Sequence, residues 1–184
     1  MLTRTLRLPI RAFLLSFAAL ASNAHADDTI NTPGDHPNYS VEIEPRMVFG
    51  WDIYSRGFGA GAHFSFPIVK NGFISGINNS VALGIGANFL VANQRYKFYD
   101  SGTMFLVVPA TVQWNLFVAR HWSIFPELGV SLYNGFFDCG GAACGAFGLR
   151  PVLEIGARYH FNDKTAFTFR IGYPFATIGI SIFQ

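Results

Sequence analysis

The chain of 184 residues has 51% hydrophobic and 13% charged side chains, with 13 Lys and Arg against 11 Asp and Glu. Three arginines fall within the first 26 residues, so the rest of the chain has ten basic and eleven acidic residues and a net charge near −1. Without a basic run, the sequence offers no electrostatic footprint for nucleic acid. Without about 18 consecutive apolar residues, it offers no transmembrane helix.

The first 26 residues predict a cleaved secretory signal peptide. The basic stretch "MLTRTLRLPIR" precedes the short apolar run "AFLLSFAALA", and Ala24-His25-Ala26 forms an A-x-A cleavage site before Asp27. The apolar run is too short to act as a stop-transfer helix. Residues 27–39 are rich in Asp, Asn and Pro and predict a flexible N-terminal lead. The remaining segment, 40–184, has the length of one domain.

Eight segments between residues 40 and 184 alternate apolar and polar side chains with a period of two, which is the pattern of β-strands with two different faces. They are 40–52, 57–68, 78–92, 103–118, 121–133, 147–161, 165–173 and 175–183. Connections such as "ARH" and "NDK" are short, whereas "NQRYKFYDSG" (93–102) and "NGFFDCGGAACGA" (134–146) are longer. Short turns at one end and longer loops at the other are typical of an up-and-down outer-membrane barrel.

The polar face decides whether such a barrel lies in a membrane or is soluble, because a lipocalin-like barrel turns its apolar face inward. Here the polar face is rich in Gly and has charges of both signs, and the chain after residue 26 has only three lysines, all outside the strand cores. Balanced arginines and carboxylates suit a closed lumen better than a water-facing exterior. Aromatic residues near strand ends match membrane girdles; these are Trp51, Trp114, Trp122, Tyr159 and Tyr173.

We therefore expect an all-β fold, a transmembrane up-and-down antiparallel β-barrel of eight strands with its apolar face toward lipid. The predicted luminal charge network has five acids and four arginines, namely Glu42, Glu44, Asp52, Glu127, Glu154, Arg46, Arg150, Arg158 and Arg170. Unpaired charges in so confined a space would be costly, so we expect Arg–carboxylate contacts that close the barrel. Glycines in the polar rows leave room for opposing Arg and Phe side chains.

The predicted signal peptide, eight alternating strands, short turns and the final "TIGISIF" resemble the superfamily of small eight-stranded outer-membrane β-barrels, which includes the OmpA transmembrane domain and OmpX. Thr177, Gly179 and Ile182 are similar to the C-terminal signal read by the barrel-assembly machinery, although Gln184 stands where an aromatic or apolar residue is usual. The resemblance implies the outer membrane of a Gram-negative bacterium, contact with outer-membrane lipid and lipopolysaccharide, the assembly machinery as a partner during biogenesis, and a monomer. It carries over no catalytic residues.

His121, Ser123 and Glu127 share one row of a predicted strand and invite comparison with outer-membrane lipid A deacylases, which use a Ser, a His and a Glu. His121-Trp122-Ser123 resembles the deacylase H-x-S, but Ile124 stands where Asn is expected. The row also faces the lumen, whereas lipid A lies outside. Residues two apart lie roughly 6.5–7 Å apart along a strand, which is a long reach for a Ser–His bond. A luminal hydrogen-bond network is the simpler interpretation, with catalysis as the alternative.

Cys139 and Cys144 enclose "GGAA" in the longest predicted loop, and in an oxidising compartment they are expected to form a disulfide. A metal site is the alternative, but no His neighbours them. His63, His121 and His160 fall on the luminal face, where partnered histidines are more ordinary than metal ligands. We expect neither a metal nor a cofactor.

The leading hypothesis for function is a structural or surface-interaction role through extracellular loops, because eight strands leave a lumen only wide enough for side chains. Two alternatives stay open. One is a narrow channel or small-ligand binder, and the other is a lipid-modifying outer-membrane enzyme.

Overall fold

The computed structural model describes residues 29–52, 55–96, 99–138 and 143–184, with the side chains of all of these except 52, 55–56, 92–96, 99–103, 137–138, 143–144 and 146. The predicted signal peptide lies outside the described residues. Eight strands are present: β1 (Glu42–Asp52), β2 (Ser55–Val69), β3 (Asn79–Tyr96), β4 (Tyr99–Ala119), β5 (Trp122–Asp138), β6 (Ala143–Asn162), β7 (Thr165–Tyr173) and β8 (Phe175–Phe183). No helix in the described part of the chain has the length and apolar character of a membrane span.

The strands form one closed barrel in which each strand pairs antiparallel with the next in the chain, and β8 returns to pair with β1. At the C-terminal end of β8, backbone hydrogen bonds continue this pairing. The amides of Ser40 and Val41 donate to the carbonyl of Gln184, and the amide of Gln184 donates to the carbonyl of Val41. Closure leaves no free edge through the body of the barrel, as a β-structure in lipid requires. The predicted fold class is confirmed.

Side chains alternate between the two faces of the barrel as the period of two predicts. The outward rows expose large apolar side chains such as Met47, Leu128 and Ile155. The inward rows bury polar ones such as Glu44, Gln113 and Arg170. Such an inside-out distribution, apolar outside and charged inside, is stable only if lipid covers the exterior.

The barrel has two ends, which we name by their connections. At the hairpin end β1, β3, β5 and β7 finish and Pro174 lies between β7 and β8, and at the terminal end lie the turns 70–78, 120–121 and 163–164 with Gln184. The peptide bond between Tyr173 and Pro174 is cis.

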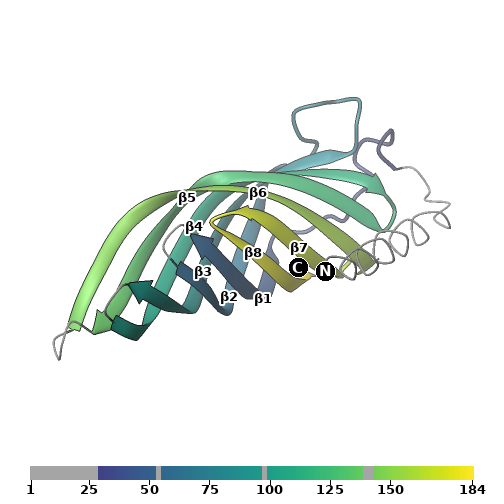
Figure 1. Cartoon of the computed structure of the whole chain (residues 1–184). Helices are drawn as coiled ribbons and strands as arrows, with labels where there is room; N and C mark the ends of the chain where they lie inside the picture. Colours follow the sequence, from purple (N-terminus) through teal and green to yellow (C-terminus); the bar gives the residue numbers. More distant parts are fainter. Residues whose placement is uncertain (1–28, 53–54, 97–98, 139–142) are drawn as a thin grey trace, which may run out of the picture.

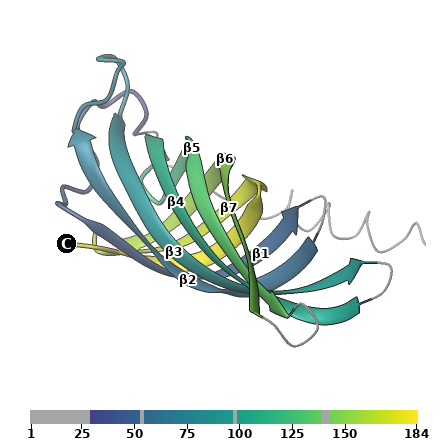
Figure 2. The same ribbon diagram turned by 90° about the vertical axis from the view of Figure 1, so that its left-hand side faces the viewer.

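The wall of the barrel is uneven at the hairpin end. Strands β3 to β6 have 17 to 21 residues, whereas β7 and β8 have nine each. Figures 1 and 2 show β3 to β6 as long ribbons that run well past the short β7–β8 hairpin. The long loops predicted at 93–102 and 134–146 are therefore wrong in extent, because most of those residues continue the β-ladders. Asn93 to Tyr96 pair with Tyr99 to Gly102, and Asn134 to Asp138 pair with Ala143 to Phe147. Tyr and Phe, which favour strands, make up much of both stretches.

The terminal end is covered by residues 29–39, which belong to the predicted N-terminal lead. Thr29 Oγ1 donates to the carbonyl of Phe117 (3.2 Å), and the His36 ring stacks on the Phe117 ring at 4.8 Å. Asn78 donates from its backbone to Ile30 O (2.7 Å) and from its side chain to Asp35 O (2.6 Å). These contacts hold the segment across the mouth of the barrel, since its backbone groups find partners there.

Near the hairpin end the lumen is filled by an apolar cluster. Val48, Leu90, Val107 and Phe175 are buried together, and Phe105 and Tyr133 pack against them. The lumen is therefore apolar toward the hairpin end and polar toward the terminal end.

Candidate functional site

The polar part of the lumen contains two arginine-centred clusters, which we call together the ladder. In the first, Arg158 makes a two-pronged contact with Glu42 (Nε to Oε1 3.0 Å, Nη2 to Oε2 2.8 Å) and donates from Nη1 to Asn115 Oδ1 (2.7 Å). Ser181 donates to the same Glu42 carboxylate at 2.6 Å. Both charged side chains are fully buried. The contact ties β6 to β1 across the lumen.

The second cluster is centred on Arg170. Its Nε donates to Glu127 Oε2 (2.9 Å), its Nη1 contacts the Glu44 carboxylate, and its Nη2 donates to Gln113 Oε1 (3.4 Å). Thr111 donates to the other Glu127 oxygen at 2.5 Å. One arginine therefore serves two carboxylates, and the ladder as a whole has two arginines and three carboxylates in direct contact.

Phe125 separates the two clusters. The guanidinium carbons of Arg158 and Arg170 lie 4.1 and 4.9 Å from its ring centroid, close enough for cation–π attraction. The ring fits because the facing residue is Gly156, where an added Cβ would lie 2.1 Å from the Phe125 ring. At Gly156 a luminal glycine therefore makes room for a Phe side chain, which is the part of the expectation that concerns Phe.

A further set of polar residues, Arg46, Asn88, Glu154 and Thr177, lies between the ladder and the apolar cluster, and we call it the upper layer. The order follows the strands: on β1, Glu44 belongs to the ladder, Arg46 to the upper layer and Val48 to the apolar cluster. On β8 the upper-layer residue Thr177 likewise comes between the ladder residue Ser181 and Phe175.

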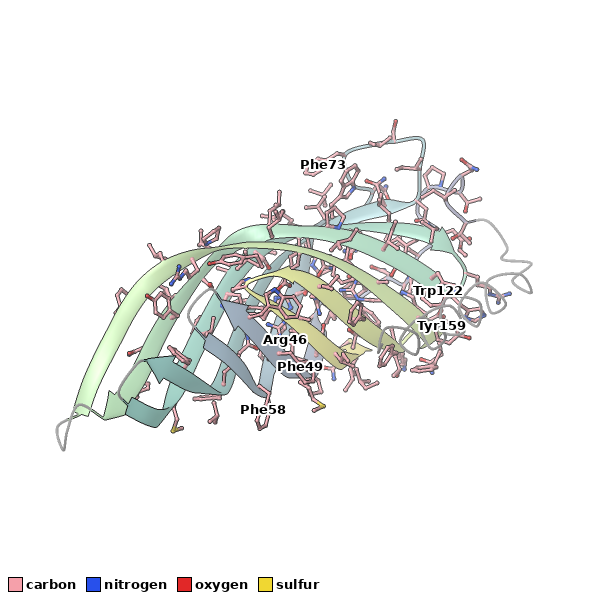
Figure 3. The ribbon with its side chains drawn as sticks, viewed as in Figure 1. Arg46, Phe49, Phe58, Phe73, Trp122 and Tyr159 are labelled. Atoms are coloured by element: carbon pink, nitrogen blue, oxygen red, sulfur yellow. The ribbon has the colours of Figure 1, made fainter. Side chains whose placement is uncertain are left out.

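The upper layer is buried but poorly paired. Arg46, only 4% exposed, donates from Nε to Asn88 Oδ1 at 3.1 Å, while its two terminal nitrogens have no hydrogen-bond partner among the described residues. Three other buried atoms likewise have no hydrogen-bond partner among the described residues: Glu154 Oε1, Asn88 Nδ2 and Thr177 Oγ1. Arg46 and Arg170 both lie within electrostatic range of Glu154. Figure 3 places Arg46 inside the ring of strands, with Phe49 and Phe58 on the outside.

The other predicted charges lie toward the hairpin end. Arg150 is half-buried, with its guanidinium 5.2 Å from the centroid of the Tyr133 ring. The side chain of Asp52 and the predicted disulfide between Cys139 and Cys144 lie outside the described residues.

The three residues considered for catalysis do not form a triad. Ser123 Oγ shares a hydrogen bond with His160 Nε2 (2.9 Å), whereas His121 Nδ1 bonds the backbone oxygen of His160 (2.8 Å). Glu127 is engaged by Arg170 and Thr111 on another level of the lumen. Nothing in this arrangement lets His121 take the proton of Ser123, as nucleophilic catalysis would require.

The histidines are held separately. His63 lies 3.5 Å from Glu127 and shares a 3.3 Å hydrogen bond with Ser65. The rings of His160 and Phe183 stack at 5.5 Å, below the lead residue Tyr39, whose ring lies 4.8 Å from Phe183. Burial raises the pKa of the Tyr39 hydroxyl well above its usual range, and the Glu42 carboxylate adds to the effect. Tyr39 therefore stays neutral over the terminal mouth. Among the described residues, no three His, Cys, Asp or Glu side chains gather as a metal site would need.

The predicted girdle residues lie at two levels of the outer surface. Trp122 and Tyr159 are exposed at the terminal end, with ring centroids 5.1 Å apart, and Trp51 is exposed at the hairpin end. Trp114 and Tyr173 are half-buried.

Sequence reasoning assigned the inward rows but not the contacts made across the lumen. Parity puts Gln113, Asn115, Phe125 and Ser181 on polar rows but gives them no role. Their roles come from partners on other strands, such as Asn115 with Arg158 and Ser181 with Glu42. The alternation of a single strand has no information on which residue stands across the barrel.

No protein-family model matches the chain, and no curated protein matches its sequence. Several solved structures share its fold, among them Ail and Neisserial surface protein A. Ail, the attachment invasion locus protein of Yersinia pestis, in complex with the heparin analogue sucrose octasulfate, matches with a TM-score of 0.51 and 8% identity over 78% of this chain and 96% of that one. Neisserial surface protein A matches with a TM-score of 0.51 and 11% identity over the same shares. Both are small eight-stranded outer-membrane barrels, so the chain has the fold predicted from its resemblance to that superfamily.

Proposed function

We propose that this protein is an outer-membrane β-barrel of a Gram-negative bacterium that keeps its lumen closed and uses the projecting part of β3 to β6 to bind partners at the cell surface. The single observation that carries the proposal is the uneven wall: the lumen is filled at the level where all eight strands are present, and four strands continue beyond it. A channel for solutes would need an open lumen, and it would have no need of strands that project beyond the barrel.

The lumen supports this role because two kinds of material fill it. The ladder occupies the terminal half with paired charges, and the apolar cluster occupies the hairpin half. Eight strands leave room only for side chains, so a wide diffusion pore is not expected.

The edge of β6 supports a binding role more specifically. Tyr173, the last residue of β7, pairs with Leu153, so β6 from Ala143 to Val152 has no β7 partner among the described residues. The His160 amide donates to His121 beside β5. Since neighbouring residues of an antiparallel strand direct their backbone groups to opposite sides, the even residues of β6 bond β5 and the odd ones face β7 or the open edge.

Three consecutive odd residues therefore present their backbone at this edge: Gly145, Phe147 and Leu149. Pro151 is the next odd residue. Proline has no backbone N–H, and at this position an N–H would face the open edge, where no neighbouring strand of the described chain accepts a hydrogen bond. Proline in a sheet usually occupies such a position. Phe147 and Leu149 are also 72% and 66% exposed. An open edge flanked by exposed apolar side chains is suited to an extended segment of another protein, which would add a strand to the sheet.

The remaining expectations belong to the same proposal. Residues 1–26 are removed as a signal peptide, the barrel-assembly machinery inserts the chain as a monomer, and lipopolysaccharide and lipid surround the outer rows. Cys139 and Cys144 form a disulfide at the tip of the β5–β6 hairpin. Sucrose octasulfate, present in the Ail structure, is a suitable first saccharide to test as a ligand of the projecting sheet.

Location and sealing are tested together. Outer membranes of expressing cells should contain a chain that begins at Asp27, and the purified protein in planar bilayers should conduct little. Recovery in the soluble periplasm would contradict the location, and large steady conductance would contradict the closed lumen.

The edge is tested by selecting displayed random peptides on the protein in nanodiscs. Phe147→Pro removes one outward-facing N–H while β5 pairing is kept, and Phe147→Ala is the matched control that retains this N–H. Selected peptides should lose binding to Phe147→Pro and keep most of it with Phe147→Ala. Equal loss with both variants would assign binding to the ring and exclude strand addition.

A narrow channel or small-ligand site is the second candidate, supported by the unpartnered polar atoms of the upper layer. Small, discrete conductance steps that disappear in Arg46→Met would favour it. The lipid-modifying enzyme receives no support, because His121, Ser123 and Glu127 are engaged separately.

A further inference from the structure

The turn between β2 and β3 differs from the other turns at the terminal end. It has nine residues (70–78), whereas the turns 120–121 and 163–164 have two each. Its sequence, "KNGFISGIN", includes one cation, Lys70, and no acid. Figure 3 shows Phe73 on this turn, which stands off the side of the barrel.

The turn has a defined shape because Asn79 organises it. The buried Asn79 side chain donates to the carbonyls of Ile74 and Ile77, each at 2.7 Å. Its oxygen accepts from the indole nitrogen of Trp114 at 3.0 Å. Gly72 adopts a positive φ of 55° beside it, and a Cβ there would lie 1.6 Å from that oxygen. One amide therefore connects the turn to the outer row of β4.

This shape presents apolar side chains outward next to the lipid-facing surface. Phe73 is 71% exposed, and its ring meets the Trp114 ring edge-on at 6.2 Å. Ile74 beside it is also exposed. In water, two exposed apolar side chains on an ordered turn would have no evident stabilising role, whereas next to the apolar belt they continue it.

The terminal ends of β2 and β3 have neither Trp nor Tyr, and the nearest girdle residue is the half-buried Trp114 on β4, against which Phe73 packs. On β5 and β6, by contrast, the Tyr159 ring contacts both Trp122 and Phe161. Aromatic rings favour the headgroup level at both faces of a bilayer.

We propose that the turn 70–78 is a membrane anchor, in which Phe73 and Ile74 insert into the headgroup region of the leaflet at the terminal end, while the Lys70 ammonium donates to Asn38 Oδ1 of the N-terminal segment at 3.2 Å. The partner is the phospholipid surface itself. The anchor rests on the proposed membrane location, and it would fix the depth and tilt of the barrel on the β2–β3 side.

The test uses the full mature chain in phosphatidylethanolamine–phosphatidylglycerol vesicles with brominated acyl chains, which quench nearby indoles. One protein keeps Trp122 as its only tryptophan and reports insertion of the barrel. The other has Phe at positions 51 and 122 and the substitution Phe73→Trp, and it keeps Trp114 because that indole donates to Asn79 Oδ1. Its quenching is compared with that of the same protein with Phe73. The introduced indole should be quenched and its emission shifted to the blue on vesicle binding.

A control with Asp163→Trp in the same background, with Trp114 kept and Phe73 unchanged, places an indole on the two-residue turn at the same end, where quenching should be weaker. Quenching of Trp122 without quenching at position 73 would overturn the anchor and leave the membrane location standing. No quenching of Trp122 would overturn both. If Phe73→Trp misfolds, the amide hydrogen exchange of residues 70–78 is measured instead in the vesicle-bound wild type and in the vesicle-bound double variant Phe73→Ser/Ile74→Ser. Equally fast exchange in the two proteins would contradict the anchor.

Discussion

The ladder and the upper layer are neighbouring parts of one lumen, built from the same residue types and buried to a similar degree. Among the described residues, however, arginine–carboxylate ion pairs lie in the ladder and none lies in the upper layer. Arg158 and Arg170 use all three guanidinium nitrogens. Arg46 uses one of its three. Burial of a charge inside a barrel therefore does not by itself provide a partner, and the partner depends on which rows meet across the lumen.

The register suggests why Glu154 is left out. Glu127 and Glu154 stand directly opposite one another on β5 and β6, so they compete for nearby cations. Glu127 has Arg170, Thr111 and His63 on its side of the lumen. Like charges in cross-strand pairs are destabilising, and one of the pair must do without a direct counter-ion.

Loss of the ladder's most connected residue should have the largest effect. Arg170→Met leaves Glu44 and Glu127 buried without their cation, and the free energy of unfolding should fall by about 3–5 kcal/mol or more. Urea unfolding in lipid vesicles measures this. A loss below about 1 kcal/mol would mean that water replaces the guanidinium and that the ladder adds little stability.

Arg158→Ala strands one carboxylate, Glu42, so its cost should be near the lower end of about 3–5 kcal/mol. The same variant tests sealing at the terminal end, where Arg158 meets Glu42. Planar-bilayer conductance should rise only if the apolar cluster is also breached, for example by adding Phe175→Ala. Full conductance from Arg158→Ala alone would show that the apolar cluster does not seal.

Gly156→Ala should have a moderate effect, since the new methyl group meets the Phe125 ring that both arginines contact. Overpacking of this kind costs about 1–3 kcal/mol. Gly76→Ala, at a position with open space around it, is the matched control and should be nearly neutral. Equal unfolding midpoints for the two variants would contradict the tight fit of Phe125.

The upper layer should give the smallest effect. The double variant Arg46→Met with Glu154→Gln keeps the net charge of the lumen. Because neither residue has an ion-pair partner among the described residues, the free energy of unfolding should change by less than about 1 kcal/mol or increase. A loss as large as that of Arg170→Met would remove the distinction between the two regions and indicate that the upper layer is paired in the membrane.

Parity predicted most of the fold but little of the site. Every strand had its faces assigned correctly, because period two is a local property that Met47 or Thr168 reveals without knowledge of its neighbours. Val81 is on the outward row of β3, yet it is only 1% exposed. Packing at the terminal end depends on the turn 70–78, whose shape Asn79 sets.

Two other features lay beyond the sequence for a related reason. The length of β3 to β6 depends on where pairing between strands ends, and turn-like letters such as Asn93 and Gly102 pair readily within a ladder. Arg158 pairs with Glu42, whereas the terminal nitrogens of Arg46 have no partner among the described residues. This difference depends on the stagger of the eight strands around the barrel. No single segment encodes that quantity.

The seam between β1 and β8 has a consequence in time. Glu42 and Glu44 stand near the start of the barrel, but their partners are Arg158, Arg170 and Ser181 near its end, 116 to 139 residues later. Contacts of such sequence separation form slowly, because the intervening chain must first be ordered. The two carboxylates must therefore stay hydrated until the last strands arrive, so that drying of the terminal half of the lumen and closure of the barrel are a single, late event.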